Sequence, residues 1–173
     1  MKKIIYISIS LLIISACNEE NSTKGNDDKS EDIFNKNCET VQDYVKSFCA
    51  ENIDYDKFYA ENAIIRGTTL GEFNMELNIE DRKIAHKQMW EKYDFSVLEP
   101  LNILPGVNAE TKKMDGSARM YANLKVTLTE NQKSITIPMY ESYDFDENGK
   151  IQLFQYFGDF TAALLSLEEE LPE

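Results

Sequence analysis

The stretch Ala118-Arg119-Met120-Tyr121-Ala122-Asn123-Leu124-Lys125-Val126-Thr127-Leu128 alternates apolar side chains with side chains that carry a polar group. Successive side chains of a strand point to opposite faces of a sheet, so this period of two predicts a half-buried strand. Residues 134–145 alternate similarly, and Asp146-Glu147-Asn148-Gly149 predicts a turn into a partner strand over 151–157. Strands joined by so short a turn pair antiparallel.

The first half of the chain has a helical period instead. Thr40 begins a variant of the capping box, and apolar residues follow it at helical spacing: Val41, Tyr44, Val45, Phe48 and Cys49. Asp54 can cap a short second helix, residues 63–67 read as a brief strand, and a third helix is predicted from about Asn78 to about Tyr93. A last helix is predicted near Asp159. Helices followed by an antiparallel sheet indicate an α+β domain, because parallel strands would need crossover helices.

Cys38 and Cys49 raise the question of a disulfide, since the chain carries features of an exported protein. A helix over residues 38–49 would separate their Cα atoms by about 15 Å, well beyond the bridging limit of about 7 Å. The predicted helix therefore argues against a disulfide between Cys38 and Cys49.

Two short segments resemble a known family. Phe58-Tyr59-Ala60-Glu61-Asn62-Ala63-Ile64-Ile65 is similar to the helix-to-strand segment of the SnoaL-like branch of the nuclear transport factor 2-like superfamily. Asn148-Gly149-Lys150-Ile151, with Phe154 and Asp159, is similar to its closing hairpin, although Asn62 stands where many members have aspartate. The resemblance implies a cone-shaped (cystatin-like) fold, with N-terminal helices packed on a curved antiparallel sheet. Members include isomerases, cyclases, ligand binders and noncatalytic adaptors, and related domains often pair through the open sheet face.

The N-terminus resembles a bacterial lipoprotein signal. Lys2 and Lys3 precede an apolar run over residues 4–14, which ends in Ile14-Ser15-Ala16-Cys17 with isoleucine in place of the usual leucine. The alternative is an uncleaved membrane helix, but the eleven residues of the run span only about 16 Å of a hydrocarbon core of about 30 Å. We therefore expect residues 1–16 to be a signal peptide and Cys17 to carry the lipid.

The residues after Cys17 predict location and organisation. Asn18 is not the aspartate that retains resembled lipoproteins at the inner membrane, which favours the outer membrane, and Glu19-Glu20 resembles the surface-export signals of some diderm bacteria. Residues 18–32 contain no aliphatic or aromatic side chain, so residues 17–32 are expected to form a lipidated, flexible polar tether. Residues 33–173 suit one compact domain.

The excess of acidic residues limits the kinds of molecule that the protein can bind. Without the signal, 16 basic residues face 31 acidic ones, so the surface would repel a polyanion and nucleic acid is not an expected partner. An anionic membrane surface would be repelled too, so attachment must come from the lipid.

Glu141 is the first catalytic candidate, because it interrupts the apolar inward run of residues 135–145. Burial would raise the pKa of this carboxyl and suit it to proton transfer toward a small apolar substrate. The alternative is a solvated carboxylate, because Pro138 often marks a bulge, and a bulge would turn Glu141 outward.

Asp159 is the second candidate. The resemblance places it near the mouth of the family's pocket, where some members have a functional acid. The alternative is a helix cap before Phe160, with a contribution of about 1 kcal/mol.

His86, the only histidine, and Trp90 one turn later are expected to line the pocket with Met120 and Phe154. A single histidine without closely spaced cysteines argues against a zinc site, and no hydrolase triad can be assembled. Asp144-x-Asp146-x-Asn148-Gly149 copies part of a calcium loop, but Gln155 replaces its bidentate glutamate, so a hairpin turn is expected.

These features predict a lipid-anchored envelope protein whose domain binds an apolar small molecule or a protein, with no cofactor or metal. An isomerase, cyclase or dehydratase that uses a pocket carboxylate is the enzymatic alternative. A homodimer formed through the sheet, without a ligand, is the third.

Overall fold

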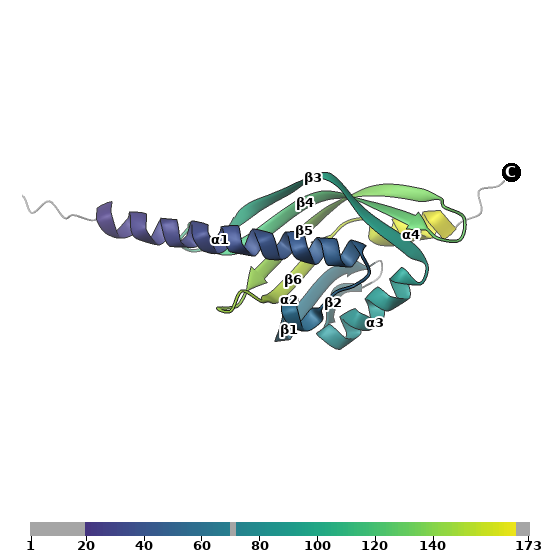
Figure 1. Cartoon of the computed structure of the whole chain (residues 1–173), viewed down its shortest axis with the longest axis horizontal. Coiled ribbons are helices and arrows are strands. Elements are labelled where there is room, and N and C mark those ends of the chain that lie inside the picture. Colours follow the sequence, from purple (N-terminus) through teal and green to yellow (C-terminus); the bar gives the residue numbers. More distant parts are fainter. Residues whose placement is uncertain (1–19, 70–71, 169–173) are drawn as a thin grey trace, which may run out of the picture.

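The computed structural model describes residues 20–69 and 72–168, in which helices pack over one curved six-stranded sheet (Figure 1). The strands are β1 (Tyr59–Thr69), β2 (Glu72–Leu77), β3 (Tyr93–Val107), β4 (Met114–Leu128), β5 (Ser134–Phe145) and β6 (Ile151–Phe157). They lie in the order β2-β1-β6-β5-β4-β3. The α+β prediction is confirmed.

One strand pair corrects the expectation of a wholly antiparallel sheet. β1 pairs with β6 in parallel, whereas the other neighbouring strands are antiparallel. Residues 70–150 separate β1 from β6 in the sequence, so no hairpin turn imposes the direction of this pair. The strands β2 and β3 had no counterpart in the prediction.

The helices are α1 (Glu20–Cys49), α2 (Tyr55–Phe58), α3 (Ile79–Trp90) and α4 (Phe160–Glu168). Two caps lie where the sequence indicated them. The side chain of Asp54 accepts a hydrogen bond from the Lys57 amide at 3.0 Å, and that of Asn78 accepts one from the Asp81 amide at 2.9 Å. These bonds satisfy amides that a helix start leaves without partners.

Helix α1 begins twenty residues before Thr40. The prediction that Thr40 caps the start of the helix is therefore wrong. Thr40 lies inside the helix and donates from Oγ1 to the carbonyl of Lys36 at 3.4 Å. A helix also takes the place of the irregular tether expected over residues 20–32, because extending an established helix adds a hydrogen bond per residue without a new nucleus. Residues 1–17, with the predicted signal and Cys17, lie outside the described residues.

Both Cys38 and Cys49 lie in α1, and both are free. The helix on which the argument against a disulfide rests is thus present. None of the described helices combines the length and hydropathy needed to cross a membrane.

The C-terminal half of α1 carries the main core against the sheet. Val41, Tyr44 and Val45 share one helix face and are buried. They pack in a cluster with buried side chains of the strands, among them Ile65, Ala118, Met120, Tyr143 and Phe154. This packing holds α1 across the sheet, as Figure 1 shows.

β4 and β5 are paired without a register shift from Ala118 opposite Tyr143 to Thr127 opposite Ser134. Pro138 faces Asn123 within this ladder, while the β5–β6 ladder begins only at Tyr140. No β6 residue is paired with Pro138, so the missing amide proton of proline costs no hydrogen bond to β6. The predicted alternative, a bulge that turns Glu141 outward, is wrong.

The β5–β6 connection is the expected hairpin turn. Asp146 Oδ1 accepts hydrogen bonds from the backbone amides of Asn148 and Lys150 at 2.9 and 2.8 Å. Gly149 has a φ of 75°, a conformation that glycine adopts at little cost. With strands on both sides, this loop has the geometry of a turn and not of a helix–loop–helix calcium site.

Candidate functional site

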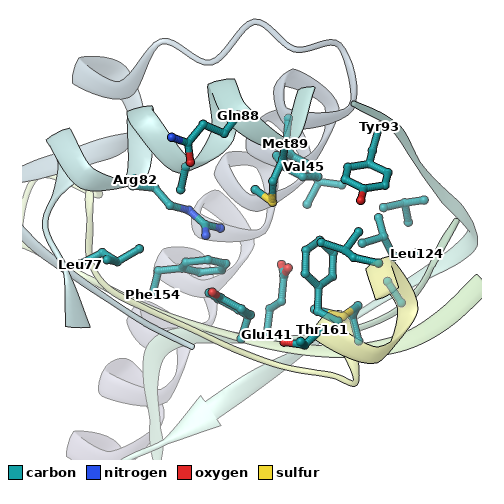
Figure 2. A pocket seen from close by; sticks show the side chains of 18 of the residues that line it. Val45, Leu77, Arg82, Gln88, Met89, Tyr93, Leu124, Glu141, Phe154 and Thr161 are labelled. Carbon is teal, nitrogen blue, oxygen red and sulfur yellow. The ribbon is translucent and has the colours of Figure 1, made fainter. Parts of the chain in front are cut away.

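A cavity of about 720 Å³ lies between the sheet and the helices α1, α3 and α4 (Figure 2). We call it the central cavity. Its walls are largely apolar and include Val45, Phe48, Met89, Val97, Leu124 and Met139. Its volume falls within the roughly 300–1,000 Å³ that is usual for small-molecule sites. The lining also contains a polar cluster around Arg82 and Glu141.

Glu141 points into the central cavity from the middle of β5 (Figure 2). It lies opposite Met120 of β4, whose side chain also lines the cavity, as does Phe154 of β6. The hydroxyl of the buried Tyr143 donates a hydrogen bond to Glu141 Oε2. Glu141, the catalytic candidate, therefore lines the same cavity as Met120 and Phe154, two of the four residues expected in the pocket.

The environment of Glu141 favours its neutral form. Burial raises the pKa of this carboxyl, while the hydrogen bond from Tyr143 and the positive charge of Arg82 act in the opposite direction and leave a net increase. A carboxyl with a raised pKa can hold a proton closer to neutral pH than an exposed one, which is the property expected of a proton donor or acceptor.

Arg82 enters the cavity from α3, and its guanidinium points toward Phe154 and Glu141 (Figure 2). The side chain is only 8% exposed. Its guanidinium carbon lies 5.2 Å from the ring centre of Phe154 and 5.1 Å from that of Tyr156, both cation–π distances. Its Nε is buried without a hydrogen-bond partner.

A pair of buried tyrosines lies beside this cluster. Tyr59 donates its hydroxyl proton to the hydroxyl of Tyr44 at 2.8 Å, and Tyr44 lines the cavity. Burial raises the pKa of both phenols, so they are neutral donors and acceptors near pH 7. The cluster therefore combines one fixed cation, one carboxyl and neutral hydroxyls.

His86 and Trp90 are not among the side chains that line the cavity, which corrects the predicted pocket. Arg82, Ala85 and Met89 of α3 form the lining stripe, and His86 and Trp90 lie one position further around the helix. Their rings pack on Phe48, at centroid distances of 5.2 and 6.0 Å.

His86 is held as a neutral core residue. It is fully buried, and its Nδ1 shares a hydrogen bond of 2.7 Å with the hydroxyl of Tyr55. Burial, aided by the charge of Arg82, lowers the pKa of its imidazole to about 2. Its Nε2 and the indole nitrogen of Trp90 have no hydrogen-bond partner.

Asp159 lies directly before α4, with its side chain exposed and outside the lining of the cavity. Its backbone carbonyl accepts a hydrogen bond from the amide of Ala163 at 3.0 Å, as expected for the residue that precedes a first helical turn. Asp159 thus has the backbone position of a residue before a helix, and a cap formed by its side chain stays a prediction.

Helix α4 closes one side of the cavity. Phe160, Thr161 and Leu164 contribute to the lining, and Glu168 at the helix end accepts hydrogen bonds from Tyr93 at 2.5 Å and Lys92 at 3.0 Å. These bonds tie the end of α4 to the start of β3.

Sequence reasoning missed Arg82 and the lining role of α4. A signal for Arg82 was present, because it lies three residues before Ala85, on the same predicted helix stripe. A charged residue on an otherwise apolar stripe is a candidate site residue.

Comparisons with solved structures support the fold. A putative SnoaL-like polyketide cyclase from Jannaschia sp. CCS1 has a TM-score of 0.58 and 12% identity, over 79% of this chain and 94% of that one. An NTF2-like protein from Burkholderia xenovorans LB400 has a TM-score of 0.58 and 11% identity, over 78% and 97%. A putative isomerase from Bacillus subtilis has a TM-score of 0.61 and 11% identity, over 73% and 88%.

No protein-family model matches the chain, and no curated protein matches it. At identities this low, the likeness to solved structures concerns the fold alone.

Proposed function

For a domain with the nuclear transport factor 2-like fold, we propose that the central cavity binds a small, largely apolar molecule. The observation that carries the proposal is a cavity of about 720 Å³ whose lining is largely apolar and includes the polar cluster around Arg82 and Glu141. Apolar walls supply affinity through burial, and a few polar groups orient the ligand.

The neutral dye N-phenyl-1-naphthylamine is a suitable first probe, because its fluorescence rises in apolar surroundings. Titration of residues 18–173, which keep α1 whole, should give saturable binding of one dye molecule. Emission that rises without saturation would contradict a defined cavity site.

We also propose that the chain is a lipoprotein of the cell envelope, anchored in the outer membrane through Cys17 and exposed at the cell surface. The support is the signal pattern at residues 1–17. Helix α1 begins three residues after Cys17, and its C-terminal half packs on the sheet. The turns that precede this packed half would then act as a spacer between the lipid and the domain.

Replacement of Cys17 by serine should abolish labelling of the protein by radioactive palmitate and move it from the membrane fraction to the soluble fraction. The lipid is the expected source of attachment, because the acidic domain would be repelled by anionic head groups. Cys38→Ser is the control and should keep both the label and the membrane location. A palmitate label that persists in Cys17→Ser would rule out this anchor.

Acid–base catalysis by Glu141 is a second candidate function, favoured by the inward carboxyl with a raised pKa. Such a group can take a proton from one carbon of a bound molecule and return it to another, as an isomerase requires. Among the solved structures of similar fold is a putative isomerase.

Glu141→Gln should abolish deuterium incorporation into the molecule that copurifies with the domain, when the complex is incubated in deuterium oxide and the molecule is weighed by mass spectrometry. The variant should fold. Burial raises the pKa of Glu141 above the pKa that the group has in the unfolded chain. Ionisation of Glu141 therefore lowers the stability of the fold as the pH rises above the pKa of the unfolded chain, and glutamine removes this loss. An absence of exchange in the wild type would leave binding alone.

Homodimerisation through the sheet stays a prediction. Tyr121, Tyr140 and Phe157 form a row of neighbouring aromatic rings on the sheet face opposite Met120 and Glu141. Tyr121 and Phe157 are 49% and 45% exposed, so the row offers an apolar surface to a second copy. A monomer mass in sedimentation velocity at micromolar concentration would contradict it.

A further inference from the structure

Arg82 is a buried cation that has no anionic partner in the part of the chain that the structure describes. Among the ion pairs between described residues, none includes Arg82, and its Nε lacks any hydrogen-bond partner. We infer that the ligand of the central cavity carries a carboxylate that binds to Arg82. This inference rests on the proposed small-molecule function and names the class of ligand: a monocarboxylic acid with an apolar body.

The first step is the cost of the buried charge. A guanidinium stays protonated in proteins, so Arg82 cannot become neutral as a lysine could. Its 8% exposure removes most of its hydration, and buried charges are normally paired with an opposite charge. The faces of Phe154 and Tyr156 and the neutral hydroxyl of Tyr44 offset only part of this cost.

The second step is that Glu141 does not complete the pair. Its carboxyl lines the same cavity and is bonded by Tyr143, but it forms no ion pair with Arg82 within the described residues. When Glu141 holds its proton, it can donate a hydrogen bond to a ligand oxygen while Arg82 supplies the charge. Two polar groups would then converge on one carboxylate.

The third step concerns the shape and charge of the ligand. Beyond the cluster, most of the lining is hydrocarbon, such as Phe48, Val97 and Leu124, which fits an aliphatic or aromatic body. The lysine of the lining, Lys92, is already paired with Glu168. A phosphate dianion fits less well, because it would bring two negative charges to one buried cation beside a carboxyl group.

The test uses displacement of N-phenyl-1-naphthylamine by two matched series, straight-chain carboxylic acids of six to twelve carbons and their primary amides. An amide has the size of the acid but no charge. The wild-type domain should bind the best-fitting acid at least tenfold more tightly than the amide of equal length. Arg82→Met should lose this preference and still bind the amide within about threefold of the wild type.

Two further variants separate a ligand contact from a structural role. Arg66→Met removes an exposed arginine that pairs with Glu76, and it should keep the preference for the acid. Arg82→Lys retains the charge without the planar fork, so its preference should fall between those of the wild type and Arg82→Met.

The outcomes distinguish the two proposals. Equal wild-type affinity for acids and amides, or a preference for acids that survives in folded Arg82→Met, would overturn the carboxylate inference and leave cavity binding intact. If the dye and both series fail to bind, the proposed function itself is contradicted. If circular dichroism shows Arg82→Met to be unfolded, the wild-type comparison and Arg82→Lys decide the question.

Discussion

Replacing Ala122 with tryptophan should lower the affinity of the domain for N-phenyl-1-naphthylamine at least tenfold, a loss of about 1.4 kcal/mol or more. Ala122 lies at the centre of β4, opposite Met139, and both side chains line the central cavity. An indole at this position would project into the space that the dye requires. The cavity of about 720 Å³ has room for the ring, so the variant should stay folded.

The matched control is Ala162→Trp. Ala162 lies on α4 with its side chain exposed, and it does not line the cavity. This variant should bind the dye as the wild type does, which excludes a general effect of the added indole. Undiminished dye binding by folded Ala122→Trp would show that the dye binds elsewhere.

Between pH 7 and pH 5, the free energy of unfolding should fall by about 2 kcal/mol less in His86→Phe than in the wild type. The imidazole has a pKa of about 2 in the fold, against 6.5 when unfolded, because it is buried and lies near Arg82. In this interval the unfolded chain binds a proton that the folded chain does not bind. The stability of the wild type therefore falls as the pH falls below about 6.5.

Urea denaturation at several pH values, compared between wild type and His86→Phe, measures this effect directly. The carboxyl groups that also titrate are common to both proteins, so the difference between them isolates the imidazole. Trp90→Phe alters the neighbouring ring without a titratable group and should keep the wild-type pH dependence. If the difference in unfolding free energy between wild type and His86→Phe does not change with pH, the description of His86 as neutral and buried is contradicted.

The parts of the fold that depend on local chemistry could be predicted from the sequence. The alternation in β4 and β5, the caps at Asp54 and Asn78, and the turn at Gly149 are set by neighbouring residues. The same alternation brought Glu141 to the inner face, once the unshifted β4–β5 register removed the bulge alternative.

Other elements could not be predicted, each for a physical reason. β3 contains Pro100 and Pro105, which edge strands tolerate, and β3 is an edge of the sheet. The first turns of α1 lack an apolar stripe to reveal them, and the parallel β1–β6 pair joins segments that are distant in the sequence.

The candidate site shows the same division. Met120, Phe154 and Glu141 lie on strands whose phase the sequence reveals, and all three line the cavity. The prediction placed His86 and Trp90 in the lining, but their rings pack on Phe48. Positions on α3 that differ by one residue face different directions, so tertiary packing decides which of them reach the cavity. Arg82 gains its significance from the lack of an ion-pair partner among the described residues, which only tertiary structure reveals.

The most direct test of ligand binding is native mass spectrometry of untagged residues 18–173, which keep α1 whole, after production in the source cells. Any bound small molecule is then released and its mass is measured. We predict a single noncovalent adduct in the wild type and in Ala162→Trp, with a strongly reduced amount in Ala122→Trp. A wild-type domain that carries no adduct, and gains none when exposed to the lipid-soluble extract of its source cells, would contradict a ligand-binding cavity.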